Sequence, residues 1–133
     1  MNRLPAFITA ITRNDVLCFV ETQAGNIPFG LLLFDLKPEL REGSKVWLLF
    51  KESEVAVATG PCGTTSFSNV FNARVSAVKQ GVILSQITLA CAAGEMDSLF
   101  STRALERMKL ETGTTVQVMI KASQIALETR YDD

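Results

Sequence analysis

Apolar and polar residues alternate along most of this chain with a period of two. Alternation of this kind is typical of β-strands that bury one face and expose the other. In the first half the alternating apolar positions are Leu4, Ala6, Ile8, Ala10, Val46, Leu48, Phe50, Val55 and Val57. In the second half they are Phe71, Ala73, Val75, Ala77, Val116, Val118, Ile120, Ile125 and Leu127. The chain is therefore predicted to consist mostly of strands.

The pattern of the first half recurs in the second. Asn2 aligns with Asn69, an offset of 67 residues, and Lys51 aligns with Lys121, an offset of 70. The second copy therefore carries three extra residues in its middle. A repeat of this kind predicts two small domains of the same fold.

One segment in each copy departs from the alternation. Residues 102–110 are rich in helix formers, and Leu105 and Met108 are spaced as on one helical face, so we expect a short helix there. The counterpart, residues 35–40, contains Pro38 and is expected to form a single turn. Each copy is thus predicted to be three strands, a short helical crossing and two strands.

This order of elements predicts an all-β fold with short helices, made of two tandem five-stranded OB-like Greek-key barrels. We place the first barrel at residues 1–60, a linker at residues 61–67 and the second barrel at residues 68–133. Halves of this size bury little core alone. We therefore expect them to pack against each other, and we expect the protein to form a homo-oligomer, either a dimer or a trimer.

Composition narrows the class of protein. Hydrophobic residues make up 47% of the chain, which favours a folded core, and the net charge of −1 argues against non-specific nucleic-acid binding. The three cysteines, Cys18, Cys62 and Cys91, lack the spacing of a metal site and histidine is absent, so we expect no metal-ion site.

The sequence also indicates the compartment. The start of the chain lacks the apolar stretch of a signal peptide, and the longest apolar run, residues 29–34, is too short to span a bilayer. The absence of both features predicts a cytoplasmic protein without membrane association.

The sequence carries no motif of a catalytic site. Histidine, the commonest general base, is absent, and there is no nucleophile elbow, P-loop or dinucleotide fingerprint. We therefore predict that the protein is a binder and not an enzyme.

Three polar clusters are candidates for a binding site. The first is Lys121–Ser123, with its echo Lys51–Ser53, each in a turn that follows an alternating strand. A lysine and a hydroxyl with backbone N–H groups between them can hold an anion, although spacing alone favours an ordinary solvated turn. The second cluster is the hydroxyl-rich segment 64–69, which taken alone is typical of a linker. The third, Ser101 and Thr102, would cap the predicted helix, and a helix start also attracts anions.

Together the three clusters resemble the Mop domain, the TOBE-type molybdate-binding module of molbindins, in two tandem copies. The family pattern opens with Ser-x-Arg-Asn, starts its helix with Thr-x-x-Ser and closes with Lys-Ala-Ser or Lys-Ala-Thr. The corresponding segments are Ser66-Phe67-Ser68-Asn69, Ser101-Thr102-Arg103-Ala104 and Lys121-Ala122-Ser123. The first copy is also similar to a repeat of the di-Mop region in molybdate-responsive transcription regulators. Those regulators carry a winged helix-turn-helix, which this sequence lacks, so we expect no direct DNA binding.

The resemblance implies non-catalytic binding of molybdate, with tungstate as a second ligand, for intracellular storage, homeostasis or sensing. It also implies a site at an interface between repeats or subunits. The implied oxyanion-binding residues are Ser66, Ser68, Asn69, Ser101, Lys121, Ala122 and Ser123, with Lys51 and Ser53 as weaker candidates in the first copy.

Four positions depart from the family pattern. Ser68 stands where the family has arginine, and Ala104 replaces a hydroxyl at the helix start. In the first copy we align Leu31 with Ser101, and Glu52 replaces a small residue. These departures favour, as an alternative function, a regulatory or protein-interaction module that has lost the anion. An oligonucleotide-binding pair of OB folds is a weaker alternative, because the few aromatic residues lie in apolar strand patterns.

Overall fold

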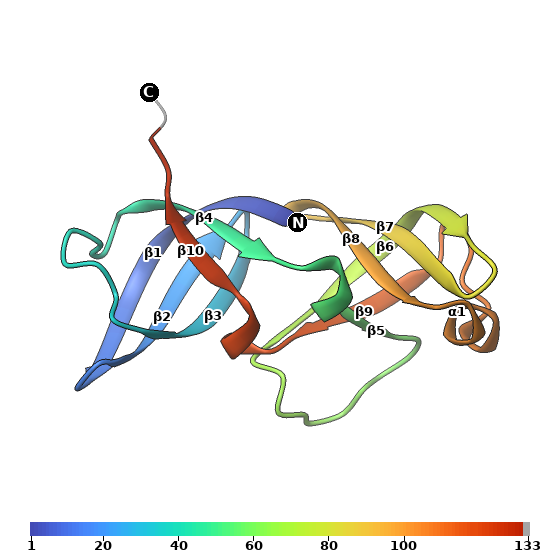
Figure 1. Ribbon diagram of the computed structural model, residues 1–133, viewed down its shortest axis with the longest axis horizontal. Helices are drawn as coiled ribbons and strands as arrows, with labels where there is room; N and C mark the ends of the chain where they lie inside the picture. Colours follow the sequence, from blue (N-terminus) through green and yellow to red (C-terminus); the bar gives the residue numbers. More distant parts are fainter. Residues whose placement is uncertain (132–133) are drawn as a thin grey trace.

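The computed structural model describes residues 1–131, so the last two residues of the predicted second domain, 132 and 133, lie outside the described part. Two five-stranded antiparallel sheets lie next to each other along the long axis of the molecule (Figure 1). The first half of the chain forms β1 (Asn2–Asn14), β2 (Leu17–Ala24), β3 (Ile27–Phe34), β4 (Lys45–Phe50), the 3-10 helix η1 (Glu52–Glu54) and β5 (Ala56–Ala58). The second half forms β6 (Asn69–Gln80), β7 (Leu84–Cys91), β8 (Gly94–Ser101), α1 (Thr102–Met108), β9 (Thr115–Ile120), η2 (Ala122–Gln124) and β10 (Ala126–Thr129).

The two halves repeat each other element by element. Strands β1 to β3 align with β6 to β8 at an offset of 67 residues, and β4 aligns with β9 at an offset of 70. The three extra residues therefore lie between β8 and β9, where α1 forms, whereas residues 35–40 contain no helix. The neighbours in the sheets run β4-β1-β2-β3 and β9-β6-β7-β8, which is Greek-key order. The prediction of two Greek-key sheets with five strands each is confirmed.

The last strand of each half belongs to the sheet of the other half. β10 pairs with β4, with Ala126 opposite Leu49, and β5 pairs with β9, with Ala56 opposite Met119. The expectation that each half keeps its own last strand is therefore wrong. The physical reason lies in the two 3-10 turns, because η1 packs on β8 and η2 packs on β3, so each turn carries the chain across to the neighbouring sheet. Figure 1 shows β10, in red near the C-terminus, beside β4 of the first half.

Because of this exchange, the segment predicted as the linker between two barrels, residues 61–67, does not connect the two sheets. Both β5 and β6 belong to the second sheet, so residues 59–68 connect two strands of one sheet. The chain crosses between the sheets at η1 and at η2 instead. The two halves are consequently interlocked.

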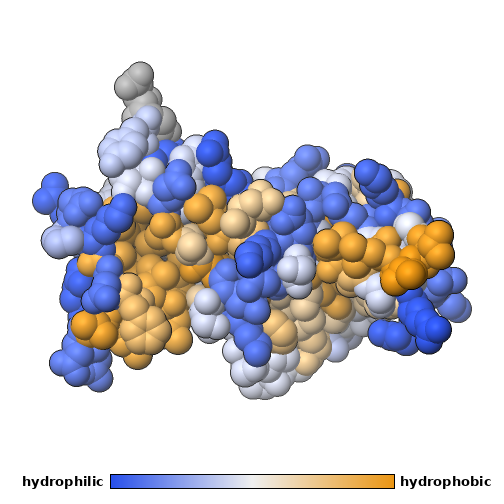
Figure 2. Space-filling view, in the orientation of Figure 1, coloured by the Kyte–Doolittle hydropathy of each residue, from blue (hydrophilic) through white to orange (hydrophobic). Residues whose placement is uncertain are grey.

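One hydrophobic core runs through both sheets. The alternating positions found in the sequence supply it, and Leu48 of β4 and Val118 of β9 are completely buried. Phe29 of β3 and Phe71 of β6 meet edge to face between the halves, with ring centroids 5.2 Å apart. Figure 2 shows that apolar surface remains over the first barrel and at the outer end of the second. No helix within residues 1–131 has the length and apolar character needed to cross a membrane.

Candidate functional site

The opening and closing motifs of the second repeat lie at the same end of one strand pair. In the β6–β9 ladder Asn69 stands opposite Ile120, and this is the last pair at that end. Ser68 precedes Asn69 and Lys121 follows Ile120, so both motifs leave the ladder together. Phe67 of the opening motif and Lys121 of the closing motif line the same pocket. The fold thus brings together two of the three motifs that the sequence singled out.

The closing motif forms the turn between β9 and β10. Lys121 is extended, with φ −71° and ψ 143°, and it precedes η2, in which Ala122 is buried and Ser123 is exposed. The N–H of Gln124 donates to the Lys121 carbonyl at 3.0 Å. The first N–H groups of a helical turn have no partner inside it, and the Lys121 ammonium makes no ion pair or hydrogen bond within residues 1–131. The turn therefore presents a cation, a hydroxyl and N–H groups on a short stretch of chain, which suits an anion.

Asn69 is buried, and its side chain is engaged with the backbone. Its amide nitrogen donates to the carbonyls of Gly30 at 3.0 Å and Ile120 at 3.1 Å, and its amide oxygen accepts the Gly30 N–H at 2.7 Å. Asn2 makes the matching pair of bonds to the backbone of Asp97, at 2.9 Å and 2.8 Å. Each asparagine thus ties the first strand of one half to the third strand of the other. Both amide hydrogens of Asn69 are therefore used by backbone carbonyls, and the side chain holds the start of β6 in place.

The remaining predicted hydroxyls, of Ser66, Ser68 and Ser101, do not line the pocket that contains Lys121. Ser101 accepts the N–H of Ala104 at 3.1 Å and is the N-cap of α1, as its position in the sequence predicts. Ser68 is exposed and lines a separate pocket of about 400 Å³ that also includes Gly30. Ser66 is exposed in the loop before β6.

In the first copy, Lys51 and Ser53 occupy the matching turn at η1. Ser53 lines the same pocket as Lys121, because η1 packs on the second sheet. Beside Lys51, the carboxylate of Glu52 accepts a hydrogen bond from the terminal ammonium of Met1 at 2.8 Å, which holds the pKa of Glu52 below its ordinary value. Glu52 is therefore an ionised acceptor engaged with the Met1 ammonium, and it has no proton to donate to an anion at this turn.

The alignment of Leu31 with Ser101 is wrong. β3 ends at Phe34 as β8 ends at Ser101, and Leu31 is buried within β3 opposite Val20. The misalignment arose because the three extra residues lie after Ser101 and not before it. The counterpart of the Ser101 cap is therefore an exposed phenylalanine, Phe34, with no helix behind it.

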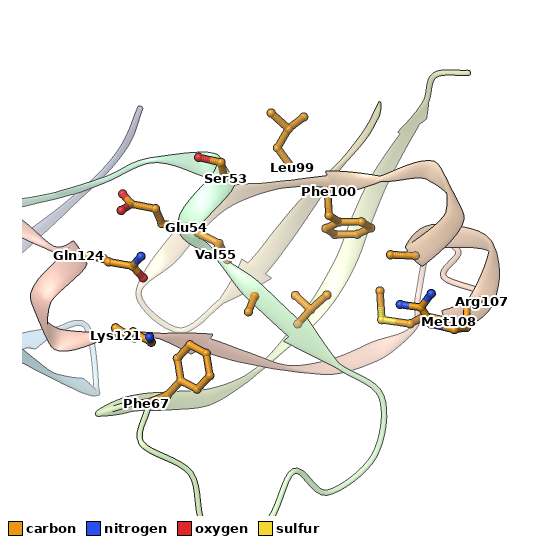
Figure 3. A pocket seen from close by; sticks show the side chains of 13 residues that line it. Ser53, Glu54, Val55, Phe67, Leu99, Phe100, Arg107, Met108, Lys121 and Gln124 are labelled. Atoms are coloured by element: carbon orange, nitrogen blue, oxygen red, sulfur yellow. The ribbon is translucent and has the colours of Figure 1, made fainter. Parts of the chain in front are cut away.

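A pocket of about 410 Å³ lies where η1 and β5 of the first half meet β8 and α1 of the second. Its walls are mainly apolar and include Val55, Val57, Phe67, Leu99, Phe100 and Met108. Its polar lining residues are Ser53, Glu54, Arg107, Lys121 and Gln124. Figure 3 shows Lys121, Glu54 and Gln124 toward one end and Arg107 toward the other. Arg107 is not predictable as a pocket residue from the sequence, because nothing in the local pattern shows that η1 will lie across from α1.

The described residues hold no obvious metal centre. Within residues 1–131 no three side chains among histidine, cysteine, aspartate and glutamate come close enough to ligate one ion. Cys18, Cys62 and Cys91 are free thiols, and Cys18 is buried.

Comparisons with known proteins agree with this architecture. The TOBE domain family matches residues 65–127, from the opening motif of the second repeat into β10. Among solved structures, the chain superimposes with a TM-score of 0.91 on the cytoplasmic molybdate-binding protein ModG, in a crystal form with molybdate bound. The superposition covers 97% of this chain and 96% of that chain at 22% sequence identity, so it establishes the fold. None of the curated proteins matches the sequence.

Proposed function

We propose that this chain, whose second repeat matches the TOBE domain, binds molybdate through that repeat and catalyses no reaction. One observation carries the proposal. The whole chain has the fold of ModG, which was solved with molybdate bound, and its two anion-type motifs meet at one end of the β6–β9 ladder. The ligand is a tetrahedral dianion, which suits a site made of N–H, O–H and ammonium groups.

Each predicted residue has a distinct part in the proposed site. Lys121 supplies the positive charge, and the N–H groups of Ala122 and Ser123 together with the Ser123 hydroxyl supply hydrogen bonds. Ser66 and Ser68 add hydroxyls from the neighbouring segment. Two further residues act through the backbone: Asn69 fixes the start of β6, and Ser101 caps α1.

The first copy is the weaker site. Lys51 and Ser53 occupy the matching turn, but the carboxylate of Glu52 lies between them, at the position where the second turn has the small, neutral Ala122. We therefore propose that molybdate binds at the second repeat, with little binding at the first.

The compartment, the role and a second ligand are proposed by analogy with ModG, which has the same fold. ModG is a cytoplasmic protein, and we propose the same compartment here, with storage, homeostasis or sensing of molybdate as the role. Tungstate, a tetrahedral dianion of the same charge, is proposed as a second ligand.

Ser66, Ser68 and Ser123 are all exposed in the single chain, so we propose that a second copy completes the site in a homo-oligomer, a dimer or a trimer, whose mass light scattering would give.

A titration calorimeter tests the proposal on the wild-type protein with molybdate, tungstate, sulfate and phosphate. We expect saturable heats with molybdate and tungstate, because hydrogen bonds to a charged ligand each contribute about 1.5–3 kcal/mol. The absence of saturable heat with all four anions would contradict the proposal.

One observation favours the alternative of an interaction module without a ligand. Ser68 is a short neutral residue at the place where the family pattern has arginine, so the opening motif supplies no charge. In that case the fold would be kept for contacts with another protein, and the four titrations would all be flat.

A further inference from the structure

We infer that the pocket between η1, β5, β8 and α1 binds a small organic monoanion with an aromatic body, of the aromatic monocarboxylate class. This ligand differs in kind from an inorganic oxyanion, and the inference goes beyond the proposed function. It rests on the volume of the pocket, on its apolar walls and on the placement of its charged side chains.

The size and the walls of the pocket indicate an organic ligand. Its volume of about 410 Å³ lies within the range of pockets that hold small organic molecules, and a bare tetrahedral oxyanion would leave most of it empty. Phe67 and Phe100 lie in different walls, and Met108 adds a thioether. Aromatic rings pack well against other rings in offset or edge-to-face arrangements, and sulfur packs well against ring edges. The body of the ligand is therefore expected to be aromatic.

The charged side chains of the pocket indicate that the ligand carries one negative group. The lining residues carry two cations, Lys121 and Arg107, and one carboxylate, Glu54, so the lining is positive overall. Within residues 1–131 neither cation makes an ion pair or a side-chain hydrogen bond. A single anionic group in the ligand would balance this excess.

The carboxylate of the ligand is assigned to Arg107. Figure 3 shows Glu54 toward the same end as Lys121, so its charge offsets that end, whereas Arg107 lies toward the other end. A guanidinium binds a carboxylate through two parallel N–H bonds, which gives both strength and orientation. Lys121 remains available to the oxyanion proposed above, so the two ligands use different residues.

The equivalent region of the first barrel does not offer the same pocket. There, β10 takes the place of β5, and the cavity is about 210 Å³, lined in part by Leu33, Phe34 and Leu127. No arginine lines it, because residues 35–40 form no helix. The larger pocket therefore depends on α1, the element that the three extra residues create.

The test uses 1-naphthaleneacetate as the probe and the neutral 1-naphthaleneacetamide as its match, each titrated into the full-length protein and followed by fluorescence. We expect one saturable site for the acid and at least tenfold weaker binding of the amide. Arg107→Gln should weaken binding of the acid about tenfold to a hundredfold and leave the amide unchanged. Arg103→Gln, an exposed arginine on the same helix that does not line the pocket, is the matched control and should change neither.

A second variant tests whether the probes bind in this pocket, by filling the pocket with a larger side chain. Ala104 lines the pocket from α1, so Ala104→Phe should fill the pocket and abolish binding of both probes while circular dichroism shows an unchanged fold. Equal affinity for acid and amide, or equal losses in Arg107→Gln and Arg103→Gln, would overturn the inference. It would also be overturned if neither probe bound the wild-type protein.

Molybdate titrations of the same variants separate this inference from the proposed function. Arg107→Gln should bind molybdate as the wild type does. If the wild-type protein bound naphthaleneacetate but not molybdate, the proposed function alone would be contradicted. If it bound molybdate but not naphthaleneacetate, this inference alone would be contradicted.

Discussion

Two asparagines hold the halves of the molecule together. Asn2 and Asn69 stand at equivalent places, and each bonds to the backbone of the third strand in the other half. Asn69 could be singled out from the sequence, because it recurs as Asn2 in the first copy and belongs to a motif. Its bond to Gly30 could not be predicted, because Gly30 is 39 residues away and comes close only when the halves pack.

Asn69→Ala should therefore destabilise the fold. The change leaves the Gly30 N–H and two carbonyls without their partner, and each buried polar group left unpaired costs about 1–3 kcal/mol. We expect the free energy of unfolding, measured in urea, to fall by at least that amount. Asn72→Ala, an exposed asparagine on the same strand, is the control and should change it by no more than about 0.5 kcal/mol. Equal stability of the two variants would show that the Asn69 bonds contribute nothing.

The strands were predictable, but their partners were not. Alternation located the strands because one face of each is buried, and the helix formers of residues 102–110 predicted α1. The exchange of β5 and β10 left no trace in the sequence. Val55 and Val57 alternate as Ile125 and Leu127 do, so either strand has an apolar face suited to either sheet. The choice depends on the direction in which η1 and η2 turn, and the apolar pattern of the sequence does not encode that direction.

Paired cysteines test the exchange. Leu49 and Ala126 are Cα partners in the β4–β10 ladder, and antiparallel partners lie about 4.5–5.5 Å apart, within reach of a disulfide. In a background where Cys62 and Cys91 are serine, we expect Leu49→Cys with Ala126→Cys to oxidise within one chain. The pair Leu49→Cys with Ala56→Cys should stay reduced, because β5 lies in the other sheet. Peptide mapping that found the disulfide only in the second pair would mean that each half keeps its own last strand.

The two halves share a fold but differ in the chemistry of their turns. Both present a lysine after the fourth strand, yet the first half adds Glu52 where the second has Ala122. The sequence was sufficient to find this difference, because the turns follow aligned strands. It was not sufficient to find Arg107 or the pocket beside it, since that pocket exists only after η1 has crossed to the second sheet. The site was thus predictable as far as it depends on local motifs, and it was not predictable where it depends on the interlocking of the halves.

We propose that the second repeat, and not the first, holds molybdate. Calorimetric titration of molybdate into Lys121→Ala and Lys51→Ala tests it most directly, because the two substitutions are the same and the two lysines are equivalent by the repeat. We predict that Lys121→Ala weakens binding by about 1.5–3 kcal/mol, roughly tenfold to somewhat more than a hundredfold, through loss of a charge-assisted bond. Lys51→Ala should bind molybdate nearly as the wild type does. Equal losses in the two variants, or no loss in Lys121→Ala, would contradict the claim.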